Sequence, residues 1–434
     1  PNHVAREYKS ICKPNGVKDL GETDDKNKHF DANNNFYYCP NEPLDTSAIP
    51  RSINNEATKP DHKSAEYTET VARCTGNDRF DAHPQANDWY ETIKLNYGID
   101  YCDWGGRSNH FNPIPDTWHK MTDILLFWAA KGIDGFRCDM AEMVPHEFWK
   151  YATEKVKAQY PHIVFIGEVY DPNQYRKYIA AGFDYLYDKV GMYDCLRDVM
   201  CEHRSANDIT RQWQATDDIS KHVLYFLENH DEQRIASNFF CGNMQKGIPA
   251  LIVAALFQCN PIMIYAGQEF GEKGMDGEGF SGIDGRSTIF DYWSIDAIRK
   301  GFFERSKLSA EQVQLEKEYR KILTLCNSEK AISNGKTFDL MYANETNDAF
   351  DSNKQFAFLR SSNNTTLLIV ANFSKTEAHI RVNIPAHAFD YMEIKEGKKN
   401  MVDLLSGNHQ SVVLQKDSSI EIVIPALNGR VYKF

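Results

Sequence analysis

Four apolar runs of this chain each lead into an acidic residue, and this recurring pattern constrains the fold more than any other feature. The runs are Ile133 to Asp139, His162 to Glu168, His222 to Asp231 and Pro261 to Glu269. Continuous apolar runs are typical of parallel strands that are covered on both faces. Asp139 and Glu168 are 29 residues apart, about one strand–helix–strand repeat. Such strands would gather acid at one rim, which in a TIM barrel holds the active site.

Arg137 stands two residues before Asp139, in what we expect to be a short buried strand. Side chains two apart on a strand point to the same side, so the two should face one another. A guanidinium group that close favours the ionised form of a carboxyl group. A structural alternative is that Asp139 only caps the helix expected over residues 145–151, since Asp is a favoured N-cap. Recurrence of the pattern favours one shared site over four separate caps.

Several of these strand ends carry short motifs that together resemble the alpha-amylase family of glycoside hydrolases, including its neopullulanase-like members. The motifs are Gly-Phe-Arg-Cys-Asp at 135–139, Gly-Glu at 167–168, Phe-Leu-Glu-Asn-His-Asp at 226–231, the opening Pro-Asn-His-Val at 1–4, and two weaker matches, Lys-Leu-Asn at 94–96 and Gly-Gln-Glu at 267–269. They occur in the order that the family has. A single motif of this length is a weak signal, whereas the ordered set is a strong one.

The resemblance implies an α/β fold: a (β/α)8 TIM barrel with an inserted second domain and a C-terminal antiparallel β-sandwich. We expect residues 1–4 to end the third barrel strand and 5–108 to form the inserted irregular domain. Residues 109–345 would then complete the barrel, and 346–434 would form the C-terminal domain. Because the chain opens in mid-motif, we expect the intact protein to carry about one hundred further residues with the first barrel strands.

Retaining hydrolysis of a glycoside needs a carboxylate nucleophile and a second carboxyl group that acts first as acid and then as base. The resemblance assigns the nucleophile to Asp139, kept charged by Arg137, and the acid/base to Glu168. A nearby negative charge favours the protonated form of a carboxyl group, so Glu168 is expected to hold its proton until the leaving oxygen takes it. Asp231 matches the third family carboxylate, which holds sugar hydroxyls.

His3 and His230 match the family histidines that bind the sugar at the cleaved bond. Asn2 matches a position that ligates calcium in many amylases, but an Asn that only orders its loop fits the sequence as well. Calcium needs several oxygen ligands, and the other ligands cannot be assigned from the sequence. The metal site is therefore unknown, and the resemblance implies no organic cofactor.

Two segments depart from the typical amylase pattern. Glu142 and Met143 stand where Lys-His is usual after the nucleophile, and Lys94 stands where amylases have Asp. The second change is closer to neopullulanases and cyclomaltodextrinases. Both places shape the acceptor side of the family's cleft, so they leave bond preference and product size open.

Residues 5–108 lack helical or strand periodicity, but their aromatic side chains favour an ordered domain over a linker. The aromatic residues are Phe36, Tyr37, Tyr38, Trp89, Tyr90, Tyr97, Tyr101 and Trp104. Asp116 is expected to cap a helix with Met121, Ile124, Leu125 and Trp128 on one face. Ser309 and Gln312 predict a capping box at a later helix. Short alternating segments past residue 345, such as 379–384 and 420–424, predict the antiparallel β-sandwich.

Composition limits the possible partners. A net charge of −12 argues against nucleic acid or an anionic membrane as the main partner. The apolar run from Gly247 to Gly267 is interrupted by Pro249 and Pro261, so it predicts a buried helix followed by a strand rather than a membrane span. None of the ten cysteines forms a Cys-x-x-Cys pair, which gives no support for zinc or redox motifs. The compartment stays undetermined, and a signal peptide cannot be judged from this start.

We therefore predict a retaining glycoside hydrolase that cleaves α-1,4-glucosidic bonds of starch, maltodextrins or related α-glucans. An enzyme of the same fold that cleaves α-1,6 bonds or transfers glycosyl groups is an alternative. A third hypothesis, from another class, is a glucan-binding protein without activity. The complete carboxylate set argues against that third hypothesis.

Overall fold

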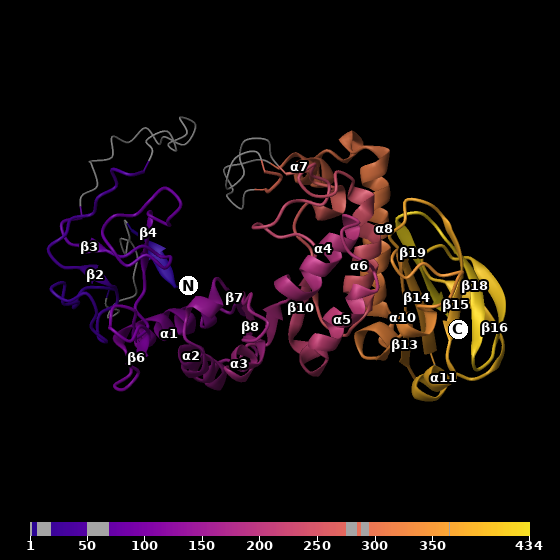
Figure 1. The fold of residues 1–434 in the computed structure, drawn as a ribbon, viewed down its shortest axis with the longest axis horizontal. Helices are drawn as coiled ribbons and strands as arrows, with labels where there is room; N and C mark the ends of the chain where they lie inside the picture. The colour runs from indigo at the N-terminus through magenta and orange to yellow at the C-terminus, as the bar shows by residue number, and fades with distance from the viewer. Residues whose placement is uncertain (1, 7–18, 50–68, 275–283, 288–294, 364) are drawn as a thin grey trace. The chain divides into compact units, whose positions relative to one another are not determined.

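The structure is a computed structural model that describes residues 2–6, 19–49, 69–274, 284–287, 295–363 and 365–434 (Figure 1). The chain divides into two compact units, Pro1–Leu186 and Tyr187–Phe434. The division falls within the short strand β9 (Tyr185–Tyr187).

The first part of the N-terminal unit consists of short antiparallel strand pairs joined by turns. The pairs are β1 (His3–Ala5) with β4 (Thr92–Lys94), β2 (Tyr38–Cys39) with β3 (Ala72–Arg73), and β5 (Ile99–Asp100) with β6 (Ser108–Asn109). A small core of Tyr37, Cys39, Ala72, Cys74 and Ala82 lies beneath them. The described part of the predicted insert is thus an ordered, packed region. Where this domain begins and ends stays a prediction, and residues 7–18 and 50–68 lie outside the described residues.

The rest of this unit alternates helices with parallel strands. Its elements are α1 (Asp116–Ala129), β7 (Gly135–Cys138), the 3₁₀ helix η3 (Ala141–Met143), α2 (His146–Gln159), β8 (Val164–Gly167), α3 (Tyr175–Ala180) and the start of β9. β8 pairs in parallel with both β7 and β9. The spacing between Asp139 and Glu168 therefore does correspond to one strand–helix–strand repeat.

Two local expectations in this region are wrong: that Asp116 caps α1 and that β7 is buried. The N-cap of α1 is Pro115, and Asp116 is the first helical residue, where its carboxylate pairs with Lys120 at 2.7 Å. The apolar face of α1 is only partly buried: Met121 is buried, whereas Trp128 is 51% exposed. β7 is partly exposed rather than buried, because it is the edge strand of the sheet that the described residues form.

The C-terminal unit begins with helices and two further parallel strands. Its elements up to residue 328 are the π-helical turn η4 (Lys189–Tyr193), α4 (Asp194–Met200), α5 (Asp208–Ala215), the 3₁₀ turns η5 (Asp217–His222) and η6 (Met244–Lys246), β10 (Val223–Phe226), α6 (Gly247–Leu256), β11 (Ile262–Met263), the 3₁₀ turn η7 (Gln268–Phe270), α7 (Asp296–Phe303), the 3₁₀ turn η8 (Arg305–Lys307) and α8 (Ala310–Ser328). β10 is buried along its whole length and pairs in parallel with β11.

The apolar run from Gly247 forms the fully buried helix α6, as predicted. The strand expected to reach Glu269 is wrong, because β11 stops at Met263 and Glu269 lies in η7. Gly267 opens that turn with φ +91°, a conformation in which an extended strand cannot continue. The predicted capping box of α8 is confirmed by reciprocal hydrogen bonds between Ser309 and Gln312.

The last hundred residues form two antiparallel sheets. The elements are α9 (Lys330–Ser333), β12 (Lys336–Asp339), α10 (Met341–Asn344), β13 (Gln355–Ser362), β14 (Thr365–Asn372), β15 (Ala378–Ile384), α11 (Ala386–Met392), β16 (Gly397–Asp403), β17 (His409–Leu414), β18 (Ser418–Ile424) and β19 (Asn428–Lys433). One sheet has the order β12-β13-β14-β19-β16-β17, and β15 pairs with β18 in the other. Two packed antiparallel sheets agree with the predicted sandwich.

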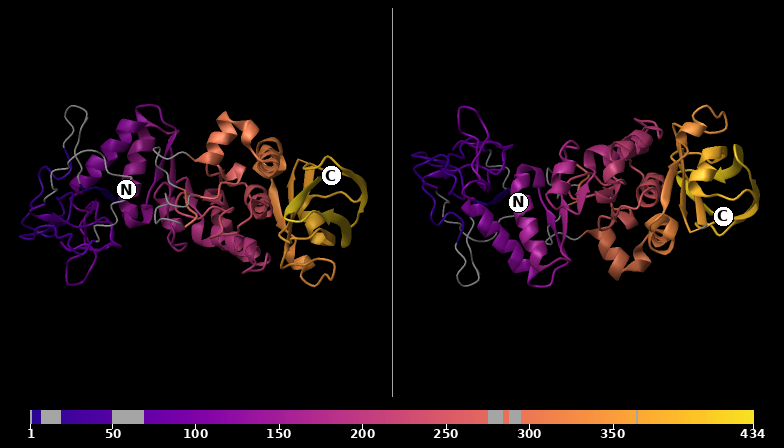
Figure 2. Two further views of the ribbon diagram at one scale, coloured as in Figure 1. Left: turned by 90° about the horizontal axis from the view of Figure 1, so that it is seen from above. Right: turned by 90° about the horizontal axis from the view of Figure 1, so that it is seen from below.

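Helix α6 contacts β14 and β19, so the buried helix and the C-terminal sheet share one packed core (Figures 1 and 2). Arg360 on β13 is fully buried and donates to the carbonyl oxygens of Leu256 and Phe257 at the end of α6. The sheet also includes β12, which precedes the expected domain boundary at residue 345; that boundary stays a prediction.

Candidate active site

Arg137 joins the two strand-end carboxylates of the N-terminal unit. Cys138 on β7 pairs with Gly167 on β8, so Asp139 and Glu168 follow neighbouring strands at the same end. Arg137 Nη1 lies 2.5 Å from Asp139 Oδ1, and its Nη2 lies 3.0 Å from Glu168 Oε2. The contact with Asp139 is the one that the strand spacing predicts. The contact with Glu168 was missed, because sequence spacing carries no information on which side chains face across two paired strands.

Glu168 is held by two further donors. Its side chain is 4% exposed. Oε2 accepts a hydrogen bond from the backbone N–H of Met140 at 2.8 Å, and Oε1 accepts one from the Tyr170 hydroxyl at 2.9 Å. Met140 has φ 46° and ψ 43°, an uncommon left-handed conformation for a side-chain-bearing residue. This strained residue directly follows Asp139, as is often seen at functional sites.

Asp139 is much more open than Glu168. Its side chain is 43% exposed, and Arg137 is 28% exposed. The N-cap of α2 is Pro145, so the alternative that Asp139 caps this helix is wrong. The site thus combines one accessible carboxylate with one buried and positioned carboxylate.

His3 lies in the electrostatic surroundings of Asp139. Burial lowers the pKa of His3 below its ordinary value, the negative charge of Asp139 opposes that shift, and Lys94 adds to it. The imidazole Nδ1 lies 2.6 Å from Asn2 Oδ1, and the ring is 5.2 Å from that of Trp89. The structure therefore places His3 within electrostatic reach of Asp139. Pro1 of the same motif lies outside the described residues.

Asn2 does not present the donors that a calcium site needs. Its side chain is buried, its oxygen faces His3, and its amide nitrogen donates to Gly76 O at 3.0 Å. Within the described part of the chain, no group of three or more His, Cys, Asp or Glu side chains could hold a metal ion. These contacts suit an Asn that orders its loop. Calcium binding stays a prediction, and we derive no step through it.

The residues that depart from the amylase pattern lie around a neighbouring cavity of about 300 Å³. Lys94, Tyr101, Glu142 and Met143 are among the residues that line it. The Lys94 ammonium donates to Asn77 O at 3.1 Å and lies 5.3 Å from the centre of the Tyr101 ring. Glu142 Oε2 accepts from the backbone N–H groups of Tyr170 and Asp171 at 2.9 and 3.0 Å. Glu142 therefore fixes the loop that carries Tyr170.

His230 and Asp231 lie together in the C-terminal unit, in the loop after β10. His230 Nε2 is 3.2 Å from Asp231 Oδ2. The side-chain oxygen of Asn229 accepts from the backbone N–H groups of Asp231 and Glu232, both at 2.9 Å. The position of this loop relative to Asp139 and Glu168 stays a prediction.

A buried ion pair holds the two ends of that loop. Arg234 Nη1 lies 2.8 Å from Glu228 Oε2, and both side chains are almost fully buried. Burial raises the pKa of Glu228, and the opposing charge of Arg234 lowers it in part. Arg234 also lies 3.9 Å from the centre of the Tyr265 ring. The only signal for this arrangement in the sequence is the opposite charge of Glu228 and Arg234, six residues apart.

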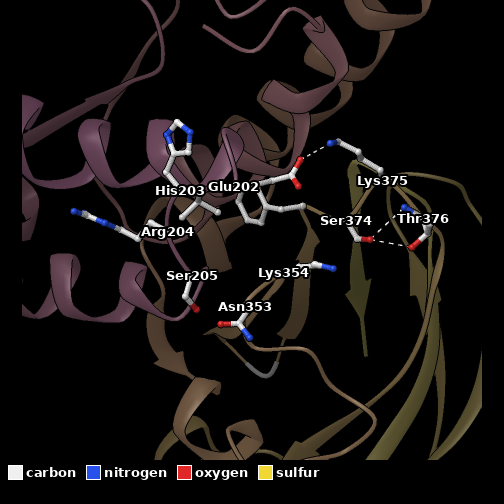
Figure 3. A pocket seen from close by; sticks show the side chains of 11 residues that line it. Glu202, His203, Arg204, Ser205, Asn353, Lys354, Ser374, Lys375 and Thr376 are labelled. Carbon is white, nitrogen blue, oxygen red and sulfur yellow. Dashed lines mark hydrogen bonds and ion pairs between the residues drawn. The ribbon is translucent and has the colours of Figure 1, made fainter.

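A larger cavity in the C-terminal unit holds none of the predicted site residues. It has a volume of about 540 Å³ and is lined by residues from 199–205, 353–354 and 373–376. Figure 3 shows its Glu202–Lys375 ion pair, at 2.5 Å, and the hydrogen bond between Ser374 and Thr376. Size alone does not make it the active site, because the carboxylate chemistry lies elsewhere.

None of the helices that the structure describes has the length and apolar character needed to cross a membrane.

Comparisons with known proteins agree with this geometry. Residues 113–337, over half of the chain, match the family model described as "Alpha amylase, catalytic domain", and residues 347–434 match "Alpha amylase, C-terminal all-beta domain". The chain is 24% identical over 328 residues to Alpha-amylase 3 of Dictyoglomus thermophilum and 23% identical over 300 residues to a cyclomaltodextrinase of Geobacillus thermopakistaniensis. The first alignment covers 69% of this chain and the second 68%. The chain spans 62% and 44% of the lengths of these two relatives.

Solved structures support the predicted barrel and C-terminal β-domain. An Anoxybacillus alpha-amylase has a TM-score of 0.57 at 19% identity, with 76% of this chain and 65% of that chain covered. A maltogenic alpha-amylase from Thermotoga neapolitana has a TM-score of 0.55 at 18% identity, with 81% and 68% covered. At these identities the likeness concerns the fold alone. The fold, the ordered motifs and the two family matches agree: this chain belongs to the alpha-amylase family and has its TIM-barrel fold with a C-terminal β-domain.

Proposed function

We propose that this protein is a retaining glycoside hydrolase that cleaves α-1,4-glucosidic bonds of starch-derived chains. The observation that carries the proposal is the bridging of Asp139 and Glu168 by the single guanidinium of Arg137. Two carboxyl groups at one rim of a parallel sheet are the minimum set for retaining chemistry. Both lie in the region that matches the amylase catalytic domain.

In the proposed reaction Asp139 is the nucleophile, because it matches the family's nucleophile motif and is the more accessible of the two carboxylates. Its oxygen attacks the anomeric carbon while Glu168 gives a proton to the leaving glycosidic oxygen. Water, deprotonated by Glu168, then breaks the covalent glycosyl–Asp139 bond. Two inversions at the anomeric carbon return the α-configuration.

The surroundings of Glu168 add a condition that the sequence did not suggest. Arg137, the N–H of Met140 and the hydroxyl of Tyr170 all donate toward its carboxylate oxygens in the ligand-free structure. A protonated carboxyl group has an O–H donor of its own and fewer positions left to accept hydrogen bonds. As the proposed acid, Glu168 must exchange at least one of these donors when substrate enters. Tyr170 is the neutral side-chain donor and is the one that we expect to move.

Asp231, His230 and His3 are proposed to hold the sugar at the cleaved bond. This part rests on the family motifs that these residues match. Burial lowers the pKa of His3, which favours the neutral imidazole, and with one nitrogen facing Asn2 its other nitrogen is proposed to bind a sugar hydroxyl. The proposed partner is accordingly an α-glucan oligosaccharide or polysaccharide.

Cleavage of α-1,6 bonds or glycosyl transfer is a second candidate, and one observation favours it. Lys94, Glu142 and Met143, which depart from the amylase pattern, line the same cavity. Relatives that match this chain include proteins named cyclomaltodextrinase and Neopullulanase 2. The cavity therefore marks where bond preference would be set.

Chromatography of digests of amylose, pullulan and cyclodextrin separates these candidates. Maltooligosaccharides from amylose, and panose or isopanose from pullulan, require cleavage of α-1,4 bonds and support the main proposal. Maltotriose from pullulan requires cleavage of α-1,6 bonds, and products longer than the substrate require glycosyl transfer, so either supports the second candidate. An Asp139→Asn variant serves as the control for contaminating activity. Binding of amylose without any product, in a preparation that is folded by circular dichroism, would contradict both and favour a glucan-binding protein.

A further inference from the structure

Two pairs of cysteines among the described residues have their sulfur atoms within 4 Å of each other. Cys39 and Cys74 are 3.9 Å apart, and Cys201 and Cys241 are 3.8 Å apart. All four are free thiols in the structure. We propose that Cys201 and Cys241 form a redox-active dithiol, which a low-molecular-weight disulfide such as glutathione disulfide converts to an intramolecular disulfide.

The backbone on both sides of this pair is already fixed. Cys201 ends α4, where its N–H donates to Arg197 O at 3.0 Å. The N–H of Cys241 donates to Ile235 O at 3.2 Å. A disulfide needs the sulfur atoms about 2.05 Å apart, so the pair must close by less than about 2 Å. Side-chain rotation can supply that distance without breaking either backbone hydrogen bond.

Cys201 opens onto a cavity with basic side chains. The cavity has a volume of about 610 Å³, and Arg197, His203 and Arg204 line it together with Cys201 and with the carboxylates of Asp194 and Asp198. The neighbouring carboxylate of Glu202 is paired with Lys375, as Figure 3 shows, which reduces its repulsion of an anion. Glutathione disulfide carries both carboxylates and ammonium groups, so a cavity lined by charges of both signs suits its approach to the Cys201 sulfur.

The two thiols have different roles because their surroundings differ. Cys201 lines the cavity, whereas Cys241 is not among the residues that line it. The contact with Cys241 lowers the pKa of Cys201, burial opposes that shift, and the charges of His203, Lys246 and Arg197 add to it. The same contact with Cys201, together with burial, raises the pKa of Cys241. A thiolate rather than a thiol attacks a disulfide, so the accessible Cys201 is the attacking residue and Cys241 the resolving residue.

The exchange balances in two steps. The Cys201 thiolate bonds to one sulfur of the glutathione disulfide, the S–S bond breaks, and one glutathione thiolate leaves. Cys241 loses its proton and attacks the Cys201 sulfur, which releases the second glutathione. Two protein thiols are oxidised, and one low-molecular-weight disulfide is reduced to two thiols.

The other described cysteines provide internal comparisons. Cys39 and Cys74 are 3% and 1% exposed and occupy diagonal rather than opposite positions across β2 and β3. Their burial keeps reagents away. Cys102 is exposed as a whole residue, but desolvation of its sulfur atom and the charge of Asp100 raise the pKa of its thiol to about 11. The burial of Cys39 and Cys74 and the raised pKa of Cys102 therefore predict that these three thiols react slowly with glutathione disulfide.

The test is to incubate the folded, fully reduced chain with glutathione disulfide, alkylate the remaining thiols and map the peptides by mass spectrometry. We expect a peptide pair linked through Cys201 and Cys241 to form before any other cysteine reacts. Cys241→Ser should stop at one glutathione attached to Cys201. Cys201→Ser should leave Cys241 reduced, and the control Cys102→Ser should behave as the wild type.

Wild-type mapping alone decides the matter if a variant does not fold. A first product at Cys102 or at the Cys39–Cys74 pair would overturn the proposal. So would uniform reaction of all the thiols, or a Cys201 that stays reduced while the chain remains folded. Attachment of glutathione to Cys241 in the Cys201→Ser variant, at the wild-type rate, would overturn the assignment of attacking and resolving residues.

Discussion

Replacing Arg137 with Gln should lower kcat/KM strongly while leaving the fold intact. Arg137 makes two contacts, and they differ in burial. Its partner Asp139 is 43% exposed, so solvent screening leaves that contact about 0–1 kcal/mol. Glu168 is 4% exposed, and a hydrogen bond to a buried charged group contributes about 1.5–3 kcal/mol.

Together these terms amount to about 1.5–4 kcal/mol of positioning and charge stabilisation, if both act in the transition state. At about 1.4 kcal/mol per tenfold, the expected loss is roughly 10- to 1,000-fold in kcat/KM. Initial rates with an aryl maltooligoside measure it directly. Circular dichroism and the thermal midpoint show that the variant is folded.

Arg79 provides a matched control in the same unit. Its side chain is 30% exposed and also contacts one exposed and one buried carboxylate, Asp81 at 3.1 Å and Asp88 at 3.5 Å. Arg79→Gln should therefore lower the free energy of unfolding by a small amount, as Arg137→Gln should, since surface ion pairs contribute little. Unlike Arg137→Gln, it should leave kcat/KM within about twofold of the wild type. An Arg137→Gln variant that keeps more than about a third of wild-type activity, or an equal loss from both substitutions, would refute the role given to Arg137.

Three further outcomes are expected. Asp139→Asn and Glu168→Gln should both abolish turnover of amylose, but an activated aryl glycoside, whose leaving group needs less protonation, should be turned over better by the Glu168 variant; equal rescue counts against the assignment. Tyr170→Phe removes a neutral donor that contacts Glu168 in the free enzyme, so kcat/KM should change by up to about tenfold, whereas an unchanged kcat/KM would argue against a role for the contact. The pKa of His3 should lie below its ordinary value. The contribution of His3 to stability is therefore full above that ordinary value and is lost as the pH falls toward the folded-state pKa. NMR titration should show a further decrease of the His3 pKa in Asp139→Asn, and an unchanged pKa would mean that His3 does not sense Asp139.

The sequence supported the parts of the fold that depend on local pattern. Apolar runs and their spacing placed β7, β8, β10 and the buried helix α6, and the Ser-x-x-Gln pattern placed the start of α8. It did not place strands with weak alternation, such as β16, in which the two buried residues come only near the end of the strand. It also failed at Glu269, where a left-handed Gly267 ends the extended backbone earlier than the apolar run does.

The candidate site shows the same limit. Arg137 and Asp139 are close in sequence, so their contact followed from strand geometry. The second contact of Arg137, with Glu168, and the donation from Met140 depend on how β7 pairs with β8 and on one left-handed residue. The contact between Tyr170 and Glu168 could have been predicted from the sequence, because the two residues are only two positions apart.

The stereochemistry of the first product tests the central claim most directly. With Asp139 as nucleophile and Glu168 as acid/base, the reaction passes through a covalent glycosyl intermediate, and the carboxyl groups should lie roughly 5–5.5 Å apart. Proton NMR during the first minutes of maltooligosaccharide hydrolysis distinguishes the anomers before mutarotation mixes them. An initial α-anomer signal is the predicted result. An initial β-anomer signal would contradict the nucleophile assignment and the retaining mechanism built on it.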